Sequence, residues 1–471
     1  MELEEFADKA IVFAANVGCQ YCDVRTEKIS KKGIVIENSE IEYPISKEDE
    51  GLGIRILYNG AWGFYSISNP SSLKIVEQAV SDAAKTARYY GEKKKTKVRL
   101  VDIPKNIDKI DYPVLEEPHL DELVKIGFDC NKIIQTKKRI FKAVTSLSYT
   151  TVSKYFVNSE GSKIFQNQTD TVADLVATAH ESGLTQSVNI TEGGRGGIEK
   201  ITKECDIFET ANFISEKASE LIDAKPVKES NSTVILNPDF VSLLTHEILG
   251  HPSEADRVLG KEMAWAGGAW WAGKIGEKIG SDSLNVFDDP TLEGSLGWYH
   301  YDDEGVKSSR TNLIEQGVLT RHLQNRETAE IFDDKPSANM RATSYKFMPL
   351  IRMACTCIDK GDWEPQEMIK EVKQGFLISN MKIPSIDMNR HNWSISCQFA
   401  NKIENGEITD LLRDVIVLGN APEFFKSIDA CANDFTVRPI TNCGKGDPMQ
   451  SMIMGNGGPS VRGMATVKSV E

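Results

Sequence analysis

The chain has 471 residues, of which 40% are hydrophobic and 26% are charged, a balance typical of a folded globular protein long enough for two hydrophobic cores. Its net charge of −14 disfavours direct binding to nucleic acid, and no apolar run reaches the ~18 residues that a membrane span needs. Nine cysteines, an odd number, do not indicate a secreted disulfide framework, and the acidic start MELEEFADKA does not resemble a signal peptide, so we expect a cytoplasmic protein.

The first half of the chain mixes helical and strand patterns. Apolar residues recur at helical spacing in four segments, 3–17, 71–90, 119–135 and 209–223. Strand patterns cover 33–37, 51–66 and 141–179, with turn residues at 158–161. Asn59-Gly60 separates the runs IRILY and WGFYS, which predicts a tight hairpin. We expect these elements to form an N-terminal α+β domain, a mixed α/β-sheet unit, over residues 1–226.

The second half is richer in glycine and in strand patterns. The polar stretch KPVKESNSTV precedes a short apolar strand and a helix that begins near Asn237, and we place the domain boundary in this stretch. Gln316-Gly317 and Asn405-Gly406 each divide two strand-like runs and predict two further hairpins, and a short helix is expected over 367–374. The sequence therefore predicts an α+β protein of two domains, with an antiparallel β-rich C-terminal domain over 227–471.

The stretch THEILGHP, residues 245–252, nearly matches the His-Glu-x-x-His helix of zinc peptidases but has one extra residue between the histidines. In a regular α-helix, histidines four apart lie ~40° apart around the axis, whereas histidines five apart lie ~140° apart. Gly250 permits unusual backbone angles, and Pro252 disfavours the α conformation of the residue before it. We therefore expect the helix to end, kink or bulge at Gly250-His251, which would let His251 turn back towards His246.

A catalytic zinc ion needs three protein ligands and one open position for water. His246 and His251 would supply two nitrogen ligands, but the local pattern does not identify the third. Glu254, Asp256, the five other histidines and the nine cysteines all stay open at this point. The alternative is a polar helix end whose two histidines make only local hydrogen bonds.

Three tryptophans follow the histidine motif in a segment rich in glycine and alanine, namely Trp265, Trp270 and Trp271. Large amphipathic rings of this kind can line a substrate cleft. They can equally fill the base of a β core. Both interpretations stay open from the sequence.

Several further segments of the second half occur in a characteristic order, namely HEILGHPSEAD, GKIGEKIG, VFDDPTLEGSLGW, YDDEGVKSSRTNLIEQGVL, RATSYKFMPLIRM and NCGKGDPMQ. In this order they resemble the TldD/PmbA (TldE) family of metallopeptidases. The run GLGIRILYNGAWGFYS extends the resemblance to the first half. The similarity covers nearly the full chain, and its ordered set of motifs is more specific than any one of them.

The resemblance implies a third metal ligand. Only the TldD branch of the family keeps His-Glu-x-x-x-His, so this chain resembles the catalytic TldD-type members, in which a cysteine of a Cys-Gly-Lys motif near the C-terminus completes the ligand set. That cysteine corresponds to Cys443. The chain departs from the family just afterwards, where Gly446-Asp447-Pro448-Met449-Gln450 replaces an acid, Gly and Gln. The implied cofactor is one divalent metal ion, zinc with iron as the alternative.

The resemblance also implies an activity, the hydrolysis of unfolded or small peptides that are held in extended form by adding a strand to a sheet edge. Glu247, next to His246, is the expected general base that takes a proton from the attacking water. His300 is a candidate donor to the oxyanion by residue type alone, with a structural histidine in a hairpin as the alternative.

The family implies a partner as well, either a PmbA/TldE-type subunit in a heterodimer or a second copy in a homodimer. A different class of function is a non-catalytic peptide-binding or regulatory protein, an adaptor of the gyrase-modulator type. The presence of His246, Glu247, His251 and Cys443 favours the enzyme, because an adaptor has no need for all four.

Overall fold

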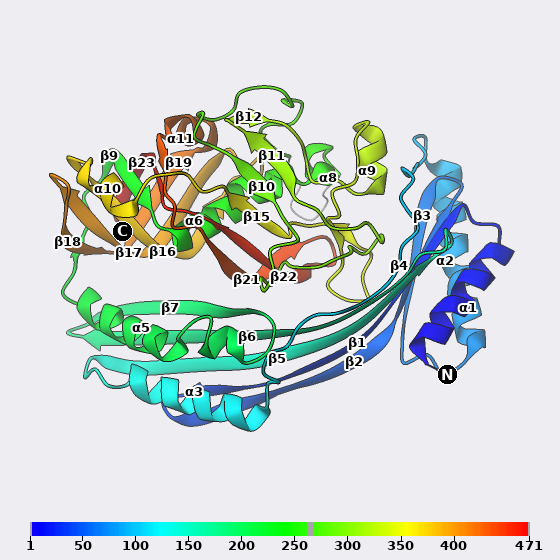
Figure 1. The fold of residues 1–471 in the computed structure, drawn as a ribbon, viewed down its shortest axis with the longest axis horizontal. Helices are drawn as coiled ribbons and strands as arrows, with labels where there is room; N and C mark the ends of the chain where they lie inside the picture. The colour runs from blue at the N-terminus through cyan, green and yellow to red at the C-terminus, as the bar shows by residue number, and fades with distance from the viewer. Residues whose placement is uncertain (1, 262–267, 470–471) are drawn as a thin grey trace.

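The structure is a computed structural model that describes residues 2–261 and 268–469, and its fold is α+β, as predicted (Figure 1). In the first half the helices are α1 (Leu3–Asn16), α2 (Leu73–Lys93), α3 (Leu120–Ile134), α4 (Glu199–Thr202) and α5 (Ile207–Leu221). The strands are β1 (Tyr21–Glu37), β2 (Glu40–Tyr58), β3 (Ala61–Ser68), β4 (Ile107–Asp111), β5 (Ile140–Asn158), β6 (Lys163–Glu181) and β7 (Leu184–Arg195). Within the described ranges, no helix has the length and apolar character to cross a membrane.

The second half contains many shorter elements. Its helices are α6 (Pro238–Leu244), the π-helix η1 (Thr245–Gly250), α7 (His251–Ser253), α8 (Ala255–Val258), α9 (Arg326–Ile331), α10 (Pro365–Lys370) and α11 (Ala421–Ser427). Its strands are β8 (Lys225–Pro226), β9 (Ser230–Leu236), β10 (Val286–Asp288), β11 (Thr311–Glu315), β12 (Val318–Leu319), β13 (Met340–Arg341), β14 (Leu350–Ile351), β15 (Cys355–Ile358), β16 (Gln374–Ile386), β17 (Asn392–Glu404), β18 (Glu407–Arg413), β19 (Val415–Asn420), β20 (Ala430–Cys431), β21 (Thr436–Lys445), β22 (Gln450–Gly458) and β23 (Val461–Ser469).

A long curved sheet dominates the first half, with strand order β3-β2-β1-β5-β6-β4 and β7 beside β6. Its longest strands have 19 residues, which corresponds to roughly 60 Å. Helices α3 and α5 cover one end of the sheet and α1 and α2 the other, all on the face turned away from the second half (Figure 1). The four predicted helices of this half are confirmed, because their apolar faces meet the buried residues of the sheet.

The second half is built on two larger sheets and lies over the concave face of the curved sheet (Figure 1). One sheet has the order β12-β11-β10-β15-β22-β21, so β21 is an edge strand. In the other, β16 pairs with both β9 and β17, and this double pairing closes β16, β9, β23, β19 and β17 into a ring. Most pairs are antiparallel, as predicted, with parallel pairs at β9–β16, β15–β22 and β8–β18.

The three predicted hairpins are confirmed. Asn59-Gly60, Gln316-Gly317 and Asn405-Gly406 all have positive φ angles at both residues and join consecutive antiparallel strands. This left-handed pair suits the right-handed twist of the strands, and Asn and Gly adopt it at low cost. The predicted domain boundary after residue 226 stays a prediction; in the structure, Lys225–Pro226 pairs with β18 of the second half.

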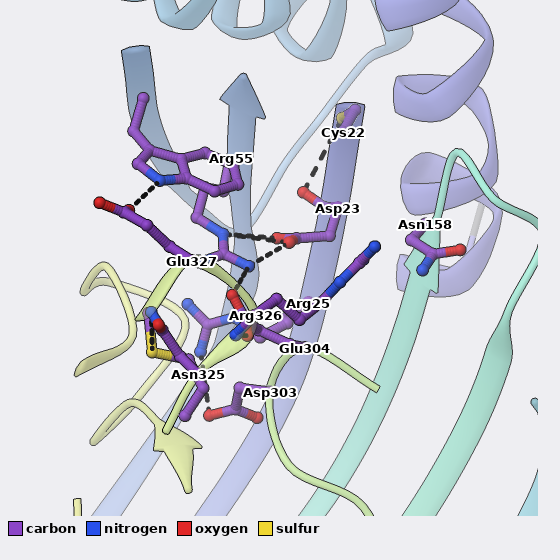
Figure 2. A network of polar contacts seen from close by, with 12 residues as sticks. Cys22, Asp23, Arg25, Arg55, Asn158, Asp303, Glu304, Asn325, Arg326 and Glu327 are labelled. Carbon is purple, nitrogen blue, oxygen red and sulfur yellow. Dashed lines mark hydrogen bonds and ion pairs between the residues drawn. The ribbon is translucent and has the colours of Figure 1, made fainter. Parts of the chain in front are cut away.

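Buried ion pairs connect the curved sheet to the second half (Figure 2). Arg55 of β2 donates to Asp23 Oδ2 at 2.6 Å and to Glu304 Oε1 at 3.0 Å, and all three side chains are at most 2% exposed. The buried Arg326 donates to both carboxylate oxygens of the exposed Glu160 at 2.8 Å. The charges of Arg55, Asp23 and Glu304 are buried on all sides and must stay paired, so this network fixes how the second half sits on the sheet.

Candidate metal centre

The histidine motif lies on one continuous helical segment that changes type within the motif. Asn237 caps α6, with its Oδ1 accepting from Phe240 N at 2.9 Å. The helix then continues as the π-helix η1 over Thr245–Gly250 and ends after Ser253, where Glu254 is extended. The predicted bulge is confirmed, but it begins at Thr245, and both Gly250 and His251 keep right-handed helical angles.

The π-helix brings the two histidines together. The backbone N–H of His251 donates to the carbonyl oxygen of His246, which is the i to i+5 bond of a π turn. Such a turn places residues five apart on the same side of the helix. The two imidazole rings accordingly lie 4.8 Å apart between centroids, edge to face.

The thiol of Cys443 comes from β21, about 190 residues further along the chain, and completes this cluster. Its Sγ lies 3.6 Å from Nε2 of His251. One possible ligand atom each from His246, His251 and Cys443 falls within 4.8 Å of the others, and all three residues are buried. The pairing of β21 with β22 is irregular between Ile440 and Cys443, next to this cluster.

The outer nitrogen of each imidazole has its own partner. His246 Nδ1 lies 2.9 Å from Asn456 Oδ1, and His251 Nδ1 lies 3.2 Å from Glu254 Oε2. An acceptor on Nδ1 fixes the tautomer that leaves Nε2 free to bind a metal, an arrangement common around metal-ligating histidines. Two imidazole nitrogens and one thiolate therefore fit a divalent ion such as zinc.

The acidic residues that stayed open as alternative ligands lie behind His251. Glu254 Oε2 also accepts from Arg257 Nε at 2.8 Å and from Lys445 Nζ at 3.1 Å. Asp256 Oδ1 accepts from Lys445 Nζ at 2.7 Å. Because Cys443 and Lys445 share β21, this contact also joins the strand to the histidine segment.

The electrostatics of the cluster favour an ionised thiol. Burial raises the pKa of Cys443, but the nearby His246, His251 and Arg352 outweigh burial and hold that pKa well below its usual range. Burial lowers the pKa of His246, and the Cys443 thiolate outweighs it and raises that pKa to about 9. These shifts favour a Cys443 thiolate beside a protonated His246, and a thiolate is the form that binds metal.

A cavity of about 520 Å³ lies against the cluster, and Glu247 lines it together with the three possible ligands. Glu247 is ion-paired with Arg390, a residue of the turn between β16 and β17. Burial raises the pKa of Glu247, but His246, His251 and Arg390 outweigh it and lower that pKa below its usual value. Arg390 belongs to no sequence motif and lies 143 residues from Glu247, so the sequence did not identify it.

His300, Trp270 and Trp271, which were also singled out from the sequence, lie outside this cavity lining. The ring of His300 packs against Tyr112 and Trp298. Trp271 is fully buried in the core and donates to Pro252 O at 2.6 Å, so it fills the base of the β core. Trp270 packs beside it, 5.3 Å away between ring centroids. Trp265 falls outside the described residues.

Comparison with known protein families shows matches along most of the chain. The PmbA/TldA metallopeptidase C-terminal domain matches residues 229–465, the central domain matches 113–224, and domain 1 of the same metallopeptidases matches 22–88. The chain belongs to the PmbA/TldD family of metallopeptidases. This family was the one expected from the ordered sequence motifs.

Two curated relatives from this family span the chain almost entirely. A metalloprotease of Methanocaldococcus jannaschii is 32% identical over 454 residues, which cover 95% of this chain and 96% of the relative. A zinc metalloprotease TldD homolog of Saccharolobus solfataricus is 26% identical over 461 residues, which cover 96% of this chain and 97% of the relative. The crystal structure of TldE from Thermococcus kodakarensis has the same fold, with a TM-score of 0.77 at 18% identity, over 98% of this chain and 100% of TldE.

Proposed function

We propose that this member of the metallopeptidase family is a TldD-type peptidase in which His246, His251 and Cys443 hold one divalent ion. Zinc is the first candidate because a zinc metalloprotease is among the relatives and the ligands are two nitrogens and a thiolate, with iron as the alternative. One observation carries the proposal: three buried ligand atoms lie within 4.8 Å of one another and share a cavity with Glu247.

The chemistry proposed for the site is hydrolysis of a peptide bond. A divalent ion bound there would lower the pKa of a water molecule and polarise a peptide carbonyl. Glu247 is the proposed general base: its lowered pKa keeps it ionised at neutral pH, so it can accept a proton from water and later give it to the leaving amine. The site is buried at its base, and burial strengthens each electrostatic contact within it.

Unfolded or small peptides held in extended form are the proposed substrates. β21 is the edge strand of its sheet, carries Cys443 and contributes residues 439–444 to the cavity lining, which supports binding by strand addition.

A PmbA/TldE-type subunit or a second copy of the chain is the proposed partner, and the cytoplasm is the proposed location. The likeness to TldE concerns the fold alone, so size-exclusion chromatography of the chain with and without a TldE-type subunit is the test of the partner.

The metal and the activity can be tested on the same samples. Purified wild type, Cys443→Ala and Glu247→Gln are compared for bound zinc and iron and for cleavage of unstructured peptides. We expect one ion per wild-type chain, loss of metal in Cys443→Ala, and loss of cleavage with metal retained in Glu247→Gln. Full metal content in Cys443→Ala would show that Cys443 is not a metal ligand. Unchanged cleavage in Glu247→Gln would show that Glu247 is not the general base. A regulatory effect that persists in Glu247→Gln would instead support the adaptor function.

A further inference from the structure

The turn between β16 and β17 directs Arg390 towards the proposed general base. Asp387 organises this turn, with its Oδ1 accepting from the backbone N–H of Asn389 at 3.1 Å and of His391 at 2.9 Å. A third contact fixes the turn from outside, where Trp270 N donates to Asn389 O at 2.9 Å. The backbone that carries Arg390 is therefore held from both sides.

Arg390 has an unfavourable backbone conformation. Its φ angle is +61°, in the left-handed region that costs a side chain other than Gly, Asn or Asp roughly 1–2 kcal/mol. Such conformations persist only where the surroundings impose them, and they concentrate at functional sites. The turn thus accepts strain at Arg390, whose side chain contacts Glu247.

The guanidinium of Arg390 has hydrogen-bond donors to spare. One Nη contacts Glu247, the side chain is 15% exposed, and the residue lines the same cavity as the proposed metal ligands. A guanidinium has five N–H donors. Among the described residues, Glu247 is the only hydrogen-bond acceptor of this side chain, so the remaining donors are available to a ligand in the cavity.

We propose that Arg390 is a catalytic residue that donates hydrogen bonds to the substrate oxygen on which negative charge develops during hydrolysis. This proposal rests on the proposed function. A water oxygen bonds to the carbonyl carbon, one water proton passes to Glu247, and the carbonyl π pair moves onto the oxygen. The guanidinium donors of Arg390 that Glu247 does not occupy then bond to the new oxyanion.

The second half of the reaction restores the starting arrangement. The oxygen pair re-forms the carbonyl, the carbon–nitrogen bond breaks, and the leaving nitrogen takes the proton from Glu247. Glu247 is then ionised again, as at the start. Of the two other cations that line the cavity, Arg257 donates to Glu254 behind His251, and Lys382 is exposed. Arg390 is the lining cation in contact with the base.

The test compares two peptide analogues that are not cleaved. A phosphinic peptide carries a tetrahedral anion at the position of the scissile bond, and the matched (E)-alkene peptide is neutral there. Calorimetry measures the affinity of both for metal-loaded wild type, Arg390→Asn and Arg390→Lys, while kcat and KM are measured on a cleavable peptide. Asparagine tolerates the left-handed turn, so Arg390→Asn keeps the backbone intact. Arg310→Met is the control, because Arg310 pairs with Asp359 on the surface.

We expect Arg390→Asn to lose about 10²–10³-fold in phosphinic-peptide affinity and in kcat, with alkene affinity, KM and metal content unchanged. The phosphinic-peptide affinity and kcat of Arg390→Lys should lie between those of wild type and Arg390→Asn, because lysine keeps the charge but not the planar donors. Arg310→Met should match wild type. Equal losses for both analogues would make Arg390 a shaping residue, and no loss would leave it a structural partner of Glu247; either result overturns the proposal. Failure of the proposed function differs, because wild type itself would then hold no metal or cleave no peptide.

Discussion

The backbone N–H of His251 donates a hydrogen bond to the carbonyl of His246, across five residues rather than four. A regular α-helix would point these two side chains ~140° apart, and they could not share one ion. The π turn removes that difference without breaking the helix, since Gly250 and His251 keep helical angles. The extra residue of the motif is therefore accommodated by a wider turn, and the turn itself becomes a requirement for the site.

Gly250 lets this wider turn pack against Met353. A Cβ atom on Gly250 would overlap the Met353 sulfur, and both residues are buried. We expect Gly250→Ala to lower the free energy of unfolding by about 1–3 kcal/mol, as overpacking does, and to weaken metal binding. Urea unfolding of the metal-free protein measures the first effect, and chelator competition the second.

A double-mutant cycle separates overlap from a general loss of stability. Met353→Ala alone should lower the free energy of unfolding by about 2–5 kcal/mol, because it leaves a cavity. Combined with Gly250→Ala, the loss should be smaller than the sum of the two single losses, because the new Cβ atom partly fills the cavity and no longer overlaps the Met353 side chain. Strictly additive effects would show that the two side chains do not compete for the same space.

Asn456 orients the ring of His246. Its amide nitrogen donates to Thr356 O at 3.1 Å, so its oxygen must face His246 Nδ1, at 2.9 Å. Asn456→Leu removes this acceptor and leaves the ring free to choose the other tautomer. We expect metal affinity to fall about 10–100-fold, measured by competition with a chromophoric chelator. Asn433→Leu, on the surface, should keep wild-type affinity, and equal affinities in both variants would contradict the assigned role.

Much of the fold could be predicted from local sequence patterns. The four long helices of the first half have apolar stripes, and each of the three hairpins has a Gly in its turn, preceded by Asn in two of them, so both could be predicted from a few neighbouring residues. The predicted range 141–179 nearly matches β5 and β6, but the strand ranges 33–37 and 51–66 were too short. β1 runs from Tyr21 to Glu37, but its middle is partly exposed where no helix covers it, so the burial pattern breaks although the strand continues.

Long-range contacts of the site could not be predicted in the same way. Glu247 and Arg390 are adjacent in space but 143 residues apart, and an arginine in a polar turn has the same local pattern whether it faces water or a carboxylate. Cys443 was reached only through resemblance to a family. A single sequence does not report which distant strand will bring a thiol to a helix.

Arg55 links the two halves of the molecule through buried charges. Its guanidinium lies between Asp23 and Glu304, and the three side chains are nearly inaccessible to water. Arg55→Met would leave two buried carboxylates without their cation, so we expect a loss of about 3–5 kcal/mol in the free energy of unfolding. Arg139→Met, which removes a more exposed pair with Asp223, should cost at most about 1 kcal/mol. Equal losses in urea unfolding would mean that the buried network does not hold the halves together.

His322 makes the protein sensitive to acid. It is fully buried, it packs edge-on against Phe332, and neither ring nitrogen has a hydrogen-bond partner in the described part of the chain. Burial lowers its pKa to about 4, although Asp334 acts in the opposite direction. The unfolded chain therefore takes up a proton near pH 6.5, before the folded protein does. The resulting stability is present above about pH 6.5 and is lost as the pH falls through about 4.

Between pH 7 and pH 5, this histidine should cost wild type about 2 kcal/mol of unfolding free energy. His322→Leu has no group to protonate at this position, so its loss over the same interval should be smaller by that amount. His180→Leu, at an exposed position, should keep the wild-type dependence. Urea unfolding of the three proteins at both pH values measures the difference. Parallel losses in all three would show that His322 takes up its proton equally well in the folded and the unfolded chain, and that burial does not exclude the charge.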